Sequence, residues 1–326
     1  MSLILGIDSG GTKTLAAVAR RDGTVIGLIR GESLDPIAAP DWRERLRALI
    51  DRLDRQPGDL AAAVLGLPFH GETLEHSAEQ ERVAAELLPI GAVVVDNDVR
   101  IAFDGALAGK AGALILAGTG SMAWASLNGP GDPHLRVGGW GDIFGDEGSA
   151  YWIGRESLAQ AAREIDGRAP ASRFSQRLLE ARGLRPDGLI GWCYGLANRR
   201  SGIADLARLV AELGAQGDST AIQILQRAGD ELAETLIAAW RKAAGDRPMR
   251  WSYAGGVTTN LQVLARIEAR VGCAPAPCRL PPVGGALLRA AQAAGWTITE
   301  DWLRQIDRTL HAFPTIREVA IREVEQ

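Results

Sequence analysis

One pattern occurs near the start of the chain and again in its second half: an apolar segment, a glycine-rich polar turn and another apolar segment. The first copy runs from Leu3 to Ala19 around the turn Asp8-Ser-Gly-Gly-Thr-Lys13. The second places Ala113–Ala117 and Met122–Ser126 around Gly118-Thr-Gly-Ser121. Short apolar runs bounded by glycine and polar residues are typical of buried strands joined by tight turns. The repeat therefore predicts two similar domains, each opening with a β-hairpin.

Both turns have the chemistry of a phosphate site. Glycine lets a ligand come close to the backbone, and N–H and hydroxyl groups can then hold phosphate oxygens. A carboxylate at a strand end, such as Asp8, can hold a metal ion through water. Ordinary glycine-rich hairpins are the alternative. We expect a triphosphate to lie between the two turns and to contact Gly10, Gly11, Thr12, Lys13, Gly118, Thr119, Gly120 and Ser121.

Two familiar nucleotide-binding motifs do not apply to these turns, because the residues around the glycines do not fit them. A P-loop needs a lysine directly after its second glycine, where this chain has Thr12. The segment Gly118–Ala123 fits the letters of a dinucleotide fingerprint, but that motif must lead into a helix. Both glycine-rich turns here lead into strand-like sequence, so neither motif applies.

Strand-like and helical segments alternate along the rest of the chain, which is typical of an α/β fold. We expect strands at 61–67, 92–96 and 250–254. We expect helices at 41–55, 73–88, 99–108, 146–165, 172–182, 203–213, 218–244, 260–270, 286–294 and 300–310. The fold class predicted is α/β, with domains at residues 1–110 and 111–326, an interdomain cleft and a helix-rich second domain. The final helices are expected either within the second domain or packed back on the first.

Three further segments are candidates for chemistry. Asp96-Asn-Asp98 lies where a buried strand ends and a helix begins, and a carboxylate there can accept a proton or merely cap the helix. Gly138–Ser149 combines glycines, acids and aromatic residues ahead of a helix. Its carboxylates Asp146 and Glu147 can bind sugar hydroxyls, with helix capping as the alternative. Gly255-Gly256 follows a strand and can either pack against a flat base or form a simple turn.

Composition excludes several classes of function. The net charge of −4 argues against nucleic acid as a partner. The three cysteines are too few and too scattered for a disulfide framework or a zinc site. We expect no signal peptide, since the first strand begins at Leu3, and no apolar run approaches the length of a membrane span. We therefore expect a cytoplasmic protein with no membrane partner.

Taken together, these motifs resemble the sugar kinase, Hsp70 and actin superfamily. Within it, the chain resembles the N-acetylglucosamine and glucosamine kinase branch of the BadF/BadG/BcrA/BcrD-type ATPases. The resemblance implies two ribonuclease-H-like domains, ATP with Mg²⁺, an amino sugar as acceptor and phosphorylation at its 6-hydroxyl. It also implies a homodimer. The matching motifs imply that Asp98 is the catalytic base and a sugar ligand, and that Asp8 holds magnesium through water. They also imply that the sugar site contains Gly139, Trp140 and Asp146, and that the adenosine site contains Gly255 and Gly256.

Two departures leave the sugar open. Met122 stands where some members of the family have a sugar-contacting asparagine, and Gly31–Pro36 is no clear match to the segment that supplies another. N-acetylglucosamine and glucosamine both fit. The alternative function is that of a BadF-type ATPase activator that phosphorylates no small molecule.

Overall fold

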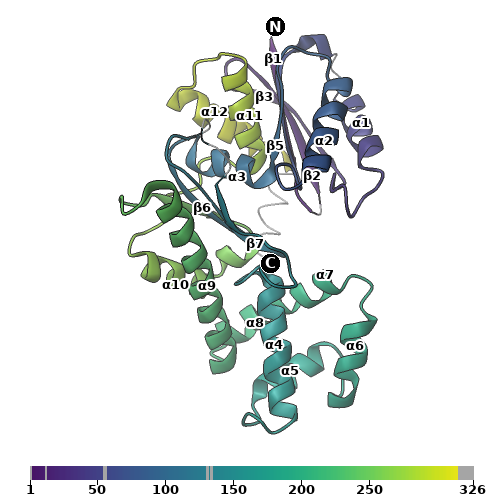
Figure 1. The fold of residues 1–326 in the computed structure, drawn as a ribbon, viewed down its shortest axis with the longest axis vertical. Coiled ribbons are helices and arrows are strands. Elements are labelled where there is room, and N and C mark those ends of the chain that lie inside the picture. The colour runs from purple at the N-terminus through teal and green to yellow at the C-terminus, as the bar shows by residue number, and fades with distance from the viewer. Residues whose placement is uncertain (1, 12, 54–56, 130–131, 133–134, 315–326) are drawn as a thin grey trace. The chain divides into compact units, whose positions relative to one another are not determined.

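The structure is a computed structural model that describes residues 2–11, 13–53, 57–129, 132 and 135–314 (Figure 1). The chain forms two compact units. Unit 1 contains the described residues of 1–112, 126–135 and 276–322, and unit 2 those of 113–125 and 136–275. Compact units defined by contacts need not coincide with domains defined by ancestry. The limits 1–110 and 111–326 therefore stay a prediction.

The sheet of unit 1 has the strand order β3-β2-β1-β4-β5. Its first three strands form an antiparallel meander, and β4 and β5 run parallel to β1. This order brings the carboxyl ends of β1, β4 and β5 to one edge of the sheet. The strands are β1 (Leu3–Ser9), β2 (Thr14–Arg20), β3 (Val25–Gly31), β4 (Leu60–Leu67) and β5 (Val93–Asn97).

Helices cover both faces of this sheet (Figure 1). Alternation along the strands divides the buried residues: Ile4 packs with the helices of one face, whereas Leu5 and Ile7 pack with those of the other. The first face carries α3 (Asp98–Leu107), α11 (Pro282–Ala293) and α12 (Glu300–Leu310). The second carries α1 (Trp42–Asp51) and α2 (Leu74–Leu87). A short 3-10 helix, η1 (Pro57–Asp59), precedes β4.

Unit 2 repeats the plan on a smaller scale. Its sheet has the order β8-β7-β6-β9, in which β8 is antiparallel to β7 and β9 is parallel to β6. The strands are β6 (Gly112–Ala117), β7 (Ser121–Ser126), β8 (Arg136–Gly138) and β9 (Trp251–Ala254). The helices are α4 (Ala150–Ile165), α5 (Arg173–Ala181), η2 (Pro186–Gly188), α6 (Leu189–Gly195), α7 (Arg199–Ala204), α8 (Leu206–Ala215), α9 (Ser219–Ala244), η3 (Gly256–Thr259) and α10 (Leu261–Val271).

Two predicted helices of unit 2 were wrong in their limits. The helix expected to start at Asp146 starts at Ala150, because Asp146 has a left-handed φ of 55° and Ser149 caps the helix by accepting a hydrogen bond from the Trp152 N–H. The helix expected over 203–213 is two helices, α7 and α8, which meet at Asp205. Helix α6 was not expected.

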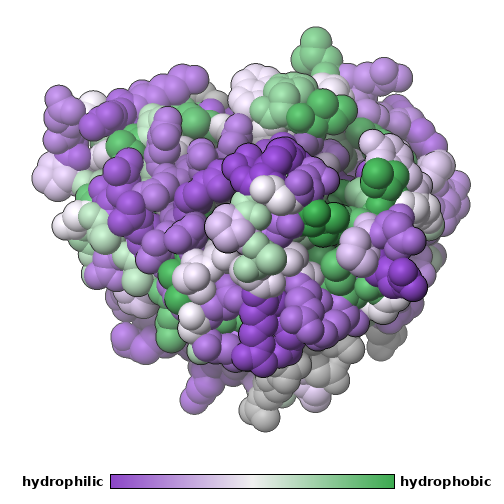
Figure 2. Space-filling view, turned by 90° about the horizontal axis from the view of Figure 1, so that it is seen from below, coloured by the Kyte–Doolittle hydropathy of each residue, from purple (hydrophilic) through white to green (hydrophobic). Residues whose placement is uncertain are grey.

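On the face drawn in Figure 2, hydrophilic side chains predominate and hydrophobic ones lie in separate groups among them. The strongly exposed apolar side chains include Trp140, Ile143 and Phe144, which lie on one loop of unit 2. Among the described residues, none of the helices has the length and apolar composition needed to cross a bilayer.

Candidate functional site

The first glycine-rich turn connects β1 to β2 and is held by hydrogen bonds within the turn and from Ser33. The Gly10 N–H donates to the Lys13 carbonyl at 3.0 Å, and the Ser33 hydroxyl donates to the Gly10 carbonyl at 2.8 Å. Ser9 and Thr14 share a hydroxyl hydrogen bond of 2.8 Å at the base of the turn. A methyl group added at Gly10 or Gly11 would meet no atom within 4 Å. The turn thus has free space beside both glycines, as a phosphate site requires. Thr12, predicted to contact phosphate, lies outside the described residues.

Asp8 and Asp96 lie in one row across the sheet of unit 1. Asp8 of β1 pairs in register with Gly66 of β4, which pairs with Asp96 of β5. Residues of one row point to the same face of a sheet, and Gly66 leaves room between the two acids for the start of α3. A side chain at Gly66 would lie 2.5 Å from Ile101 of that helix. The row gathers acidic groups at the edge where β1, β4 and β5 end.

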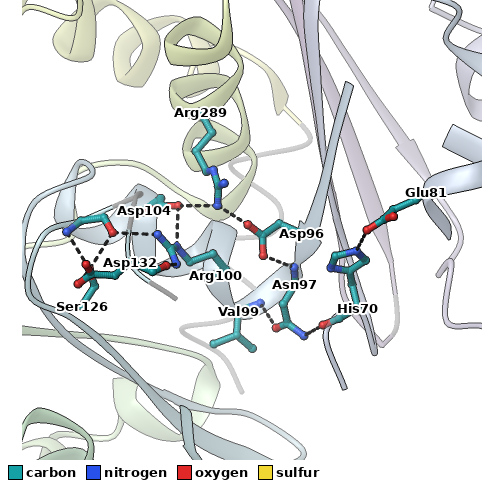
Figure 3. Close-up of polar contacts among 11 residues, drawn as sticks. His70, Glu81, Asp96, Asn97, Val99, Arg100, Asp104, Ser126, Asp132 and Arg289 are labelled. Atoms are coloured by element: carbon teal, nitrogen blue, oxygen red, sulfur yellow. Dashed lines mark hydrogen bonds and ion pairs between the residues drawn. The ribbon is translucent and has the colours of Figure 1, made fainter. Parts of the chain in front are cut away.

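The junction between β5 and α3 carries Asp98 as the first residue of the helix. Asn97 caps α3: its Oδ1 accepts a hydrogen bond of 3.0 Å from the Val99 N–H. Its Nδ2 donates to the His70 carbonyl at 2.9 Å (Figure 3). The same Nδ2 also donates to Glu72 Oε1 at 3.3 Å. The Asp98 carboxylate itself accepts from the Val99 N–H at 2.9 Å. A capped junction of this kind holds the backbone on both sides of Asp98.

The environment of Asp98 favours its protonated form. Burial, together with the negative charges of Glu72 and Asp35, raises the pKa of Asp98 to about 7, although the bond from the Val99 N–H acts in the opposite direction. Within the described part of the chain, Asp98 makes no ion pair with an arginine or lysine. A carboxyl group with a pKa near neutrality is suited to accept a proton at physiological pH.

In unit 2, the second glycine-rich turn packs against the start of α4. The N–H groups of Ala150 and Tyr151 donate to the carbonyls of Gly118 and Thr119 at 2.9 and 3.2 Å. The Ser121 hydroxyl donates to the Glu147 carbonyl at 2.7 Å. The second predicted phosphate turn and the predicted sugar segment are therefore neighbours at one end of the same sheet.

Asp146 connects these two segments. It is 2% exposed and accepts a hydrogen bond of 3.3 Å from the Ser121 N–H. Burial raises its pKa, whereas the Arg200 guanidinium at 2.5 Å stabilises the carboxylate. Gly120 lies directly beside this pair, because a methyl group there would come within 2.7 Å of both side chains. Sequence reasoning missed Arg200, which lies on α7 with no motif around it.

The other predicted residues of unit 2 differ in their surroundings. Gly255 has a φ of 95° and lies against the second turn: a methyl group on it would be 2.4 Å from the Ala117 carbonyl oxygen. Gly256 begins η3 directly after it. Gly139, with a φ of 71°, lies against Met122. Trp140 is 63% exposed, with the Arg136 guanidinium 5.8 Å from the ring centroid. Gly255 thus lies directly beside the start of the second turn, at Ala117 and Gly118.

The structure therefore gathers the predicted residues into two groups, one in each unit. Unit 1 holds the first turn, Asp8 and Asp98, and unit 2 holds the second turn, Gly139, Asp146 and Gly255. Comparison with known proteins identifies the family. The model of the BadF/BadG/BcrA/BcrD ATPase family matches residues 5–289. The chain belongs to this family.

Three curated relatives match over most of their length. An N-acetylmuramic acid/N-acetylglucosamine kinase from Clostridium acetobutylicum is 28% identical, over 81% of this chain and 88% of the relative. An N-acetyl-D-glucosamine kinase from Dictyostelium discoideum is 26% identical, over 82% of this chain and 89% of the relative. The glucosamine kinase GspK from Vibrio cholerae is 24% identical, over 75% of this chain and 82% of the relative.

Solved structures confirm the fold class. The crystal structure of a proposed N-acetylglucosamine kinase from Chromobacterium violaceum has a TM-score of 0.71 at 24% identity, covering 88% of this chain and 98% of that one. A ROK family glucokinase from Streptomyces griseus, in complex with glucose and AMPPNP, has a TM-score of 0.54 at 15% identity, covering 90% and 99%. The predicted α/β, actin-like ATPase fold is confirmed.

Proposed function

We propose that the protein transfers the γ-phosphoryl group of ATP to the 6-hydroxyl of an amino sugar, N-acetylglucosamine or glucosamine. The observation that carries the proposal is the position of Asp98 together with its raised pKa. It begins a helix at the carboxyl edge of the sheet, and its pKa of about 7 suits it to take the proton of a hydroxyl group. The family and the kinase names of the relatives point to the same chemistry.

In the proposed reaction the protein positions the reactants and neutralises charge, as phosphoryl transfer requires. Asp98 accepts the proton of the sugar 6-hydroxyl as its oxygen attacks the γ-phosphorus. The turn at Gly10, Gly11, Thr12 and Lys13 and the turn at Gly118, Thr119, Gly120 and Ser121 hold the phosphate oxygens. Gly255 and Gly256 lie against the adenosine, and Gly139, Trp140 and Asp146 bind the sugar.

We propose magnesium as the ion that neutralises the charge of the phosphates. Asp8 fits it, since its carboxylate is half-buried at the end of β1, beside a turn with open space around its glycines. A carboxylate in that setting can hold the ion through water. We also propose a homodimer and a cytoplasmic location, where ATP is the phosphoryl donor; size-exclusion chromatography with light scattering and cell fractionation test these two points.

A coupled assay of ADP release tests the function. The acceptor panel contains glucosamine, N-acetylglucosamine, N-acetylmuramic acid and glucose, each with ATP and magnesium. We expect release that depends on an amino sugar and that Asp98→Asn lowers by roughly 10²–10⁴-fold while nucleotide still binds. Mass spectrometry of the product locates the phosphate. ADP release that is equal with and without every sugar would instead support the activator function.

A further inference from the structure

A chain of four buried charged side chains lies beside the β5–α3 junction in unit 1 (Figure 3). Arg289 of α11 lies between two carboxylates, Asp96 of β5 and Asp104 of α3. The Arg289 Nη1 is 3.3 Å from Asp104 Oδ2, and the same oxygen accepts from Arg100 Nε at 3.2 Å. We call Asp96, Arg289, Asp104 and Arg100 the ion-pair chain. With side-chain exposures from 0% for Asp104 to 15% for Arg289, its charges depend on one another for compensation.

Both ends of the ion-pair chain are fixed to backbone. At one end, Arg100 donates to the carbonyls of Gly129 and Asp132 at 3.0 and 3.2 Å. At the other, Asp96 Oδ1 accepts a hydrogen bond of 2.8 Å from the Asn97 N–H, while its Oδ2 pairs with Arg289. The guanidinium of Arg289 therefore fixes the carboxylate that holds the N–H of Asn97, the residue before Asp98.

The consequence of losing Arg289 follows from charge. Asp96 and Asp104 would face each other without the cation that now separates them, in a site where burial already raises the pKa of Asp104. A buried carboxylate that loses a neighbouring cation tends to take up a proton or to move toward water. Asp104 keeps its ion pair with Arg100, so the change falls mainly on Asp96. Movement of Asp96 would release its bond to the Asn97 N–H and shift the first turn of α3, on which Asp98 lies.

We propose that Arg289 is a positioning residue for Asp98: through Asp96 it holds the β5–α3 junction in the orientation that presents the base. This inference rests on the proposed function, in which Asp98 takes the proton of the sugar. Arg289 itself touches neither reactant. Its contribution is geometric, and a displacement of about 1 Å at a reacting group can cost on the order of 10²-fold in rate.

Steady-state kinetics of Arg289→Met and Arg289→Lys across pH 5.5–9 test the proposal. We expect Arg289→Met to lower kcat by about 10–100-fold, with little change in the KM for ATP. The acid limb of its kcat/KM profile should move, because the surroundings of Asp98 change. Arg289→Lys keeps a cation between the carboxylates and should recover part of the loss. The matched control is Arg43→Met, which removes an ion pair to Glu79 between α1 and α2 of the same unit and should leave kcat and the pH profile unchanged.

A second readout does not need catalysis. The change in melting temperature caused by Asp98→Asn at pH 8 reports how strongly the site raises the pKa of Asp98. In the Arg289→Met background this change should be smaller, because a displaced carboxyl group is better solvated. If no amino sugar is phosphorylated, the proposed function fails but this comparison still tests Arg289. An Arg289→Met protein with kcat within twofold of the parent, the same pH profile and the same effect of Asp98→Asn would overturn the proposal.

Discussion

Replacement of Asp98 by asparagine should make the protein inactive and, at alkaline pH, more stable. The folded-state pKa of Asp98 is about 7, above the ordinary value of 3.8 that applies to the unfolded chain. A group raised in this way contributes stability that is present below about pH 4 and is lost as the pH rises through 7. At pH 8 the folded protein therefore carries the full cost of an ionised, poorly solvated carboxylate. Asparagine has nearly the same shape and no charge, so it removes that cost.

The magnitude follows from the size of the shift. A change from 3.8 to about 7 corresponds to at most about 4 kcal/mol of unfolding free energy. The Asp98 side chain is only half-buried, so solvent screening reduces the expected gain to about 1–2 kcal/mol. For a unit of this size that gain raises the melting temperature by roughly 2–8 °C. The gain should shrink as the pH is lowered to 4, where Asp98 of the folded protein is almost fully protonated.

Differential scanning calorimetry of the parent and of Asp98→Asn from pH 4 to pH 8, at constant ionic strength, measures this difference. The transition of unit 1 must be resolved, because two compact units need not unfold together. Activity measured on the same samples shows the accompanying loss of kcat. The reasoning is refuted if Asp98→Asn is no more stable than the parent at pH 8, or if it is equally stabilised at pH 4 and pH 8. The second outcome would point to packing instead of charge.

Four further substitutions have distinct expected outcomes. Asp132→Asn should destabilise the protein at pH 8: hydrogen bonds led by that from the Asn128 N–H lower the Asp132 pKa to about 2, and this contribution is present above pH 4 and lost as the pH falls through 2. Gly118→Ala should weaken ATP binding about tenfold in a titration with an unchanged melting temperature, because its methyl group meets no atom of the chain. In contrast, Gly255→Ala should cost about 1–3 kcal/mol of stability, since the residue has a φ of 95° and lies against Ala117. Finally, Arg200→Met should raise the KM for the sugar several-fold, because it leaves Asp146 buried without its cation.

The parts of the fold that sequence predicted correctly depend on local patterns. The two hairpins are buried apolar runs with glycine between them, and such runs can be recognised from a few consecutive residues. Helix α12 was predicted over its observed limits, Glu300–Leu310. The start of α4 was missed because the left-handed φ of Asp146 depends on tertiary contacts with Ser121 and Arg200. Aspartate at that position reads as an ordinary helix cap.

The parts of the site that sequence could not give are contacts between distant residues. Arg200 and Asp146 are 54 positions apart, and Arg289 and Asp96 are 193 apart. Neither arginine belongs to a motif, and arginine on a helix surface is ordinary. The motif positions themselves, such as Asp8, Gly118 and Asp98, stay predictions that rest on short-range chemistry, which restricts which residues work in such turns and strand ends.

The arrangement of charges at the β5–α3 junction indicates which acid can serve as the base. Position in the sequence alone did not distinguish Asp96 from Asp98, and the family resemblance gave the role of base to Asp98. Asp96 is bound to the Arg289 guanidinium and to the Asn97 N–H. Asp104 is bound to both Arg289 and Arg100. Asp98 instead faces the negative charges of Glu72 and Asp35. Asp96 therefore holds the junction, whereas Asp98, which makes no ion pair with an arginine or lysine among the described residues, keeps its affinity for a proton. Asp96→Asn should impair catalysis through geometry and Asp98→Asn through chemistry.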